Sequence, residues 1–228
     1  MRVNKLFTIL FFVLIISACS GDRFTVEGTV TDPLFRGEKV YLVALDGPVS
    51  RQVDSTLIRE GKFRFSLKAD SMEVRILRVA PKYPATIQDL VVIAEKGNLT
   101  ASLGKVSRGG GTRLNDRLHS WKKDKEVHDS LLWVIYRQKE ESTLHPALRD
   151  TLSARADAIH RSFREGNITL LEQNLRNGIG LLLFKLYFHD LPVEVKNRVM
   201  QETGDLYFRH DAELANQLRR GIQLPEKP

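Results

Sequence analysis

The sequence predicts an α+β protein: an N-terminal antiparallel β-sandwich or barrel-like module followed by a C-terminal all-α helical subdomain. From Phe24 to Leu103, apolar and polar residues alternate with a period of two, which is typical of half-buried strands. After the three glycines Gly109–Gly111 the period changes to about 3.6, as in helices with one buried face. We therefore expect a β domain over residues 24–108 and a helical domain over residues 112–228.

The β half divides into about seven short segments separated by Gly, Pro and Asp turns. In the clearest of them Phe63 and Phe65 lie on one face, while Lys62, Arg64 and Ser66 lie on the other. Spacing of this kind predicts two packed layers of strands. The expected strands are residues 24–31, 39–45, 52–58, 62–67, 72–80, 90–94 and 99–103.

The helical half carries apolar stripes on two long segments, starting near Leu114 and at Pro146. Residues 179–188 are almost entirely apolar, so we expect this segment to be buried. Trp133 is expected in the core of the first long helix. The glycine-rich segment 104–111 is interpreted as a flexible, protease-sensitive hinge between two separately packed units.

Composition and charge exclude several classes of protein. Hydrophobic residues make up 42% and charged residues 28%, which is ordinary for a globular chain and excludes a disordered or collagen-like one. The formal net charge is +7, but the basic residues are spread thinly and the densest cluster, Lys122–Glu126, has mixed signs. That cluster is interpreted as a solvated helix face, and no nucleic-acid partner is expected.

The first 18 residues have the layout of a secretory signal peptide. A short basic segment precedes the apolar core Leu6–Ile16, which is far shorter than the ~20 residues of a membrane-spanning helix. The next residues complete a sequence that resembles a bacterial lipobox, Ile16-Ser17-Ala18-Cys19. In such signals the cysteine thiol receives a diacylglyceryl group and cleavage occurs just before it. The alternative is an uncleaved signal anchor with an incidental cysteine.

Lipidated Cys19 would attach the protein to a membrane of a bacterial cell envelope, with the folded part facing the periplasm. Residues 19–23 form the linker, which is short enough to hold the first strand close to the headgroups. Cys19 is also the only cysteine. An internal disulfide, a Cys-x-x-Cys redox pair and a cysteine zinc site are therefore excluded within this chain.

No motif predicts catalysis, and no catalytic residue, cofactor or metal ligand is expected. Gly109–Gly111 lacks the lysine and hydroxyl residue of a Walker loop, and no nucleophile elbow of the GxSxG type is visible. The histidines show no close ligand spacing. His119 and His128 are nine residues, or two and a half turns, apart on one expected helix and should lie on opposite sides.

Several motifs, in this order, resemble those of a known family. They are Phe24-x-Val26-x-Gly28-x-Val30, Gly37-x-x-Val40-Tyr41-Leu42, Asp54-Ser55 with Gly61-x-Phe63-x-Phe65, Gly111-Thr112-x-x-Asn115-Asp116, and Glu172-x-Asn174-x-x-Asn177-x-x-Gly180. They are similar to the N-terminal domain, of unknown function (the 4369 type), of Bacteroidetes lipoproteins. In those relatives it commonly precedes a thioredoxin-like domain of the AhpC/TSA type.

The resemblance implies that the sequence stops, at Pro228, close to where a thioredoxin-like domain would start. We therefore expect that domain and its cysteines to be lacking, and no functional residue is carried over from the relatives. The expected function is a non-enzymatic binding or scaffolding role for a lipid-anchored envelope protein. Two alternatives stay open: a docking subunit for a separately encoded thioredoxin-like protein, and an envelope hydrolase with an unrecognised site.

Overall fold

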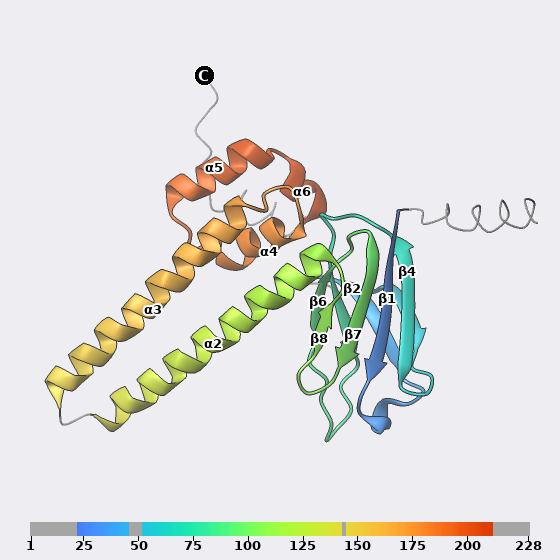
Figure 1. The fold of residues 1–228 in the computed structure, drawn as a ribbon, viewed down its shortest axis with the longest axis horizontal. Helices are drawn as coiled ribbons and strands as arrows, with labels where there is room; N and C mark the ends of the chain where they lie inside the picture. The colour runs from blue at the N-terminus through green and yellow to red at the C-terminus, as the bar shows by residue number, and fades with distance from the viewer. Residues whose placement is uncertain (1–21, 46–51, 143–144, 212–228) are drawn as a thin grey trace, which may run out of the picture.

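The α+β class is confirmed by the computed structural model, which describes residues 22–45, 52–142 and 145–211. Two four-stranded sheets face each other at the N-terminal end, and helices follow (Figure 1). One sheet has the order β4-β1-β7-β8 and the other the order β3-β2-β5-β6. We call them the first and the second sheet.

The strands are β1 (Arg23–Val30), β2 (Lys39–Ala44), β3 (Gln52–Leu57), β4 (Lys62–Lys68), β5 (Val74–Val79), β6 (Leu90–Ile93), β7 (Gly97–Leu103) and β8 (Arg108–Gly110). The helices are the short 3-10 helix η2 (Pro33–Phe35) and α2 (Arg113–Glu141), α3 (Pro146–Glu172), α4 (Gly178–Tyr187), α5 (Val193–Thr203) and α6 (Leu206–His210). All described strand pairs are antiparallel except β1 and β7, which run parallel. Residue periodicity gives the buried face of a strand but not its direction, so the sequence did not reveal this pair.

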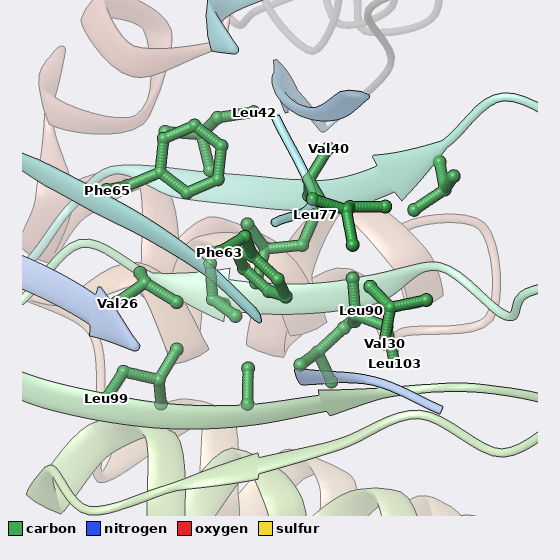
Figure 2. Close-up of a cluster of buried hydrophobic side chains, with 14 of the residues drawn as sticks. Val26, Val30, Val40, Leu42, Phe63, Phe65, Leu77, Leu90, Leu99 and Leu103 are labelled. Atoms are coloured by element: carbon green, nitrogen blue, oxygen red, sulfur yellow. The ribbon is translucent and has the colours of Figure 1, made fainter. Parts of the chain in front are cut away.

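Alternating residues of both sheets fill the space between them. Figure 2 shows side chains of the first sheet, such as Val26 and Phe65, directed toward those of the second, such as Leu42 and Leu77. All four are at most 2% exposed. Burial of this continuous apolar layer, at about 25 cal/mol per Å², is the main force that holds the sheets together.

The apolar residues of the helical part are covered both by its own helices and by the sandwich. As expected, the apolar segment is buried over most of its length: Ile179 and Leu181–Phe184 of α4 are at most 2% exposed. They belong to a cluster that includes Leu118 of α2 and Val199 of α5. The same cluster includes Met72, Val74 and Ile93, which come from the second sheet and the turn before it.

A buried polar joint attaches α2 to the edge of the second sheet. The side chain of Asn115 accepts a hydrogen bond from the Ile93 backbone N–H and donates one to the Ile93 carbonyl, both at 2.8 Å. Asn115 thus pairs with β6 as a neighbouring strand would, while remaining only 3% exposed. A Glu95 oxygen accepts from the backbone N–H groups of Leu114 at 2.5 Å and of Asn115 at 3.0 Å.

Glu95 therefore caps the first turn of α2 from outside the helix. Thr112 occupies the N-cap position but makes no capping hydrogen bond with its side chain, which donates to Glu95 at 2.6 Å instead. A carboxylate at this end of a helix satisfies free N–H groups and interacts well with the helix dipole. The start of α2 is thus fixed to the residues that follow β6.

The expectation of a flexible hinge at residues 104–111 does not fit this arrangement. Arg108–Gly110 forms β8, which pairs with β7. Gly111 has φ +108°, and a Cβ there would lie 2.9 Å from the Asn98 carbonyl oxygen. The glycines are therefore required by close backbone approach and a left-handed turn. The division into domains at residues 108 and 112 stays a prediction, but the shared core leads us to expect one cooperative unit.

A second motif from the sequence shapes the turn between α3 and α4. Asn177 accepts a hydrogen bond from the Ile179 backbone N–H at 2.9 Å and so caps α4. Its own amide donates to Asn174 at 3.0 Å. A Cβ on Gly180 would lie 2.2 Å from the Asn174 carbonyl oxygen, so only glycine fits there. These three residues serve structure.

The expectation that Trp133 is a core residue is wrong. Its side chain is 61% exposed, with Arg137 above the ring at 5.1 Å. The hairpin of α2 and α3 extends away from the rest of the molecule (Figure 1), so its distal part has only one partner helix to pack against. Leu132 and Ile135 take the positions that face α3.

We predict that Asn115→Ala lowers the free energy of unfolding by about 2–4 kcal/mol, because it leaves the Ile93 N–H and carbonyl buried without partners. Chemical denaturation followed by circular dichroism measures this change. Asn98→Ala is the matched control, because Asn98 is exposed on β7. Equal destabilisation of the two variants would contradict the structural role given to Asn115.

Candidate functional site

The residues that the sequence singles out as sites, the lipidation residue Cys19 and the lipobox residues Ile16, Ser17 and Ala18, lie outside the described residues. In the described part of the chain, no group of three or more His, Cys, Asp or Glu side chains is placed to hold a metal ion. No helix there combines the length and the apolar character needed to cross a bilayer.

A large groove of about 1280 Å³ lies over the outer face of the first sheet. It lies on the side of that sheet opposite the sandwich core, and β1, β4, β7 and β8 form its floor. Leu57 and Arg59 line it beside β4, and His119 of α2 lines it near β8. We call this hollow the sheet groove.

Strand register places polar side chains across the groove floor in rows. Residues that pair across neighbouring strands point to the same face of the sheet. One row therefore runs from Lys62 through Thr29 and Ser102 to Arg108. It spans three strand spacings, or about 14 Å, with a cation at each end and two hydroxyl groups between.

A second row, next to the first, runs from Arg64 through Glu27 and Thr100 to Gly110. Glu27 lies 3.7 Å from Arg64, and both side chains are more than 60% exposed. An ion pair in such an exposed position contributes little to stability. It also leaves both groups accessible to solvent and ligand.

Near β8 the floor is bare backbone. A Cβ on Gly110 would lie 2.6 Å from an Asp116 carboxylate oxygen, and one on Gly109 would lie 2.9 Å from Leu90. Residues with side chains would therefore collide with the start of α2 and with β6. The absence of side chains lets α2 approach this edge and keeps the floor of the groove low.

The charge of the groove is strongly positive. Its lining includes the four cations Arg59, Lys62, Arg64 and Arg108 and a single carboxylate, Glu27. Arg108 also lies 3.4 Å from Glu126, another exposed pair. Burial, together with the positive charges of Lys123, Arg108 and Lys122, lowers the pKa of His119, so its imidazole is mainly neutral at pH 7.

The lining combines cations and hydroxyl groups with one carboxylate and one histidine. Within the described residues, His119 forms no hydrogen bond to a hydroxyl or carboxylate group that would activate a nucleophile. Besides His119, Phe63 is the one aromatic residue among those that line the groove. Its side chain is directed into the sandwich core and is 5% exposed. A sugar ring would therefore find cations and hydroxyl groups, but no stacking platform.

Part of this site was visible in the sequence. The alternation in β1 and β4 already separates Glu27, Lys62 and Arg64 from the buried residues. Their convergence with Ser102 and Arg108 depends on β7 lying between β1 and β8. No local pattern carries that information. His119 and His128 do lie on different sides of α2: His119 lines the sheet groove, and His128 stacks on Phe163 of α3 at 4.1 Å.

Comparison with known proteins identifies the N-terminal part of the chain. No match was found among curated proteins or among solved structures. Residues 24–118 match a family described as a domain of unknown function (DUF4369). The matched segment covers the whole sandwich and ends at Leu118, so it includes the Glu95–Asn115 joint and the start of α2. The N-terminal part of the chain thus matches the DUF4369 family, and most of the α-helical segment follows the matched residues.

Proposed function

We propose that this protein is a lipid-anchored binding protein of the bacterial cell envelope, and that its sheet groove holds a segment of an anionic polysaccharide. The observation that carries the proposal is the groove lining, with four cations, one carboxylate and several hydroxyl groups on a concave sheet face. Cations attract acidic groups, and Ser and Thr hydroxyls both donate to and accept from sugar hydroxyls.

The size and openness of the surface favour a polymer over a small molecule. At about 1280 Å³ the groove is larger than the ~300–1,000 Å³ usual for small-molecule pockets. A floor with cations at both ends of a row matches a ligand that repeats its charge. Neutral glycans are disfavoured, because no exposed aromatic ring lines the groove to stack on them.

The membrane anchor rests on the sequence of residues 1–19. Cys19 is the only cysteine, and the linker before β1 is short. An anchor there would hold the sandwich, and with it the sheet groove, near the headgroups on the periplasmic side. The groove would then meet polymers that lie close to the membrane.

The alternative of a docking subunit for a separate thioredoxin-like protein has one observation in its favour. Val127, Leu131 and Val134 form an exposed apolar stripe on α2, at spacings of four and three residues. Exposed apolar side chains that lie together mark protein–protein contact surfaces. The hydrolase alternative has no comparable support, because the groove lining offers no activated nucleophile.

We predict that the double variant Lys62→Gln/Arg108→Gln binds polygalacturonate about 3- to 30-fold more weakly than the unchanged protein, since two exposed charge interactions of ~0.3–1 kcal/mol are lost. Isothermal titration calorimetry measures the affinity, which should also fall with added salt. Arg149→Gln/Arg155→Gln, on exposed positions of α3, carries the same charge change as a control. Binding of neutral dextran with equal affinity, or equal loss in both double variants, would contradict the proposal.

We also predict that Cys19→Ser abolishes incorporation of labelled fatty acid and leaves uncleaved precursor or released protein. Metabolic labelling followed by membrane fractionation measures both effects. Ser20→Ala is the control and should be lipidated normally. Undiminished labelling of the serine variant would refute the lipobox interpretation without affecting the groove.

A further inference from the structure

A second, smaller cavity lies between the second sheet and the helices. Its volume is about 260 Å³, and most of its wall is apolar. Most of the apolar side chains come from three elements: Leu90 and Val91 of β6, Leu118 and Trp121 of α2, and Leu182 and Leu186 of α4. Leu45, which follows β2, adds to the wall. Cavities with such walls stay free of water and take up apolar molecules. Because Leu186 is 53% exposed, the cavity reaches the surface at α4.

The Trp121 ring holds a fixed position at this cavity. Its indole N–H donates to the Asn167 side-chain oxygen of α3 at 2.9 Å. Because this hydrogen bond uses only the indole N–H, the apolar part of the ring forms part of the cavity wall. Trp121 is therefore both a structural part of the cavity and a fluorescent reporter inside it.

One cation at the cavity lacks an anionic partner. The Lys122 ammonium group donates to the Gln88 side-chain oxygen at 3.1 Å and to the Ser107 carbonyl at 3.2 Å, and both acceptors are neutral. An ammonium group has three donors, and no described residue accepts from the third. In the cluster interpreted as a solvated helix face, Lys123, Asp124 and Glu126 are exposed, whereas Lys122 is half-buried.

The other charged groups around the cavity are already paired. Lys125 lies 2.5 Å from Asp129, and Asp89 lies 2.6 Å from Arg78. Glu126, one turn along α2 from Lys122, lies 3.4 Å from Arg108. Burial lowers the pKa of Lys122, and attraction by Glu126 opposes that effect only in part. An anion beside Lys122 would offset the cost of burying its charge.

We propose that this cavity binds a single-chain amphiphile with an anionic headgroup, of the fatty-acid type. The chain lies among Val91, Leu118 and Leu182, and a headgroup oxygen accepts the remaining hydrogen bond of Lys122. The apolar wall and the half-buried lysine are independent observations, and each selects one end of the same ligand. This cavity adjoins the sheet groove, with which it shares Gly109 and His119, but the proposed contacts of the amphiphile do not depend on polysaccharide binding.

The test uses Trp121 fluorescence in the variant Trp133→Phe, which removes the exposed second tryptophan and leaves one reporter. The probe is 11-bromoundecanoate, whose bromine quenches an indole on contact. Below the micelle concentration of the probe, saturable quenching is expected. The uncharged analogue 11-bromoundecanol should bind about tenfold or more weakly, because a hydrogen bond to a charged group is lost.

Three further substitutions in the Trp133→Phe background separate the two ends of the ligand. Lys122→Gln should weaken carboxylate binding about tenfold and bring it to the level of the alcohol. Lys123→Gln, at the exposed neighbouring position, is the matched control and should change nothing. Val91→Phe fills the cavity and should abolish quenching by both probes. Leu186→Glu, at an exposed position that tolerates substitution, should do the same if the Phe variant does not fold.

Quenching that fails to saturate would overturn the proposal. So would equal affinity for the carboxylate and the alcohol, or binding that survives both Val91→Phe and Leu186→Glu in folded protein. Polygalacturonate binding should be unchanged in Lys122→Gln, which keeps this result distinct from that of the sheet groove.

Discussion

The pairing of Asn115 with the backbone of Ile93 fixes the start of α2 against the second sheet. One side chain on the first turn of α2 takes the place of a strand beside β6, and Glu95 caps the same turn. The two hydrogen bonds to Ile93 are buried and those to Glu95 are partly buried, so they are costly to leave unmade and they specify one position for the helix. With α2 fixed, the hairpin, α4 and the apolar cluster they share with Met72 and Val74 have a defined place against the second sheet.

Both candidate ligand sites follow from that position of α2. Its first turns pass the glycines of β8, so His119 lines the sheet groove while Leu118 and Trp121 line the smaller cavity. The groove lies on the first sheet and is polar and basic. The cavity lies between the second sheet and the helices and is mainly apolar, with one lysine, Lys122, that has no anionic partner among the described residues. The two hollows meet at Gly109 and His119, and their linings differ because the groove extends over the outer face of the first sheet while the cavity extends between the second sheet and the helices.

The sequence predicted the features of the fold that depend on local burial and missed those that depend on contacts with distant parts of the chain. Alternation found the strands and inward residues such as Val26 and Phe65, since a half-buried strand requires it. The parallel pairing of β1 with β7 was not predicted, because the direction of a strand is set by the path of the whole chain. Trp133 was placed in the core because apolar residues usually are, yet no element of the described chain covers that side of the hairpin. Gly109–Gly111 predicted a flexible backbone. Glycine is required there instead by close packing of Gly109 against Leu90 and of Gly110 against Asp116.

The central claim is that the sandwich and the helices form one cooperative unit through the Asn115 joint and the shared core. Native-state hydrogen exchange at increasing denaturant concentration tests it most directly. The amides of Leu42 and Leu77 in the second sheet and of Leu182 and Leu183 in α4 should reach the same free energy of exchange, equal to that of global unfolding. Exchange of the α4 amides at a clearly lower free energy, while the strand amides stay fully protected, would show two separate units and contradict the account.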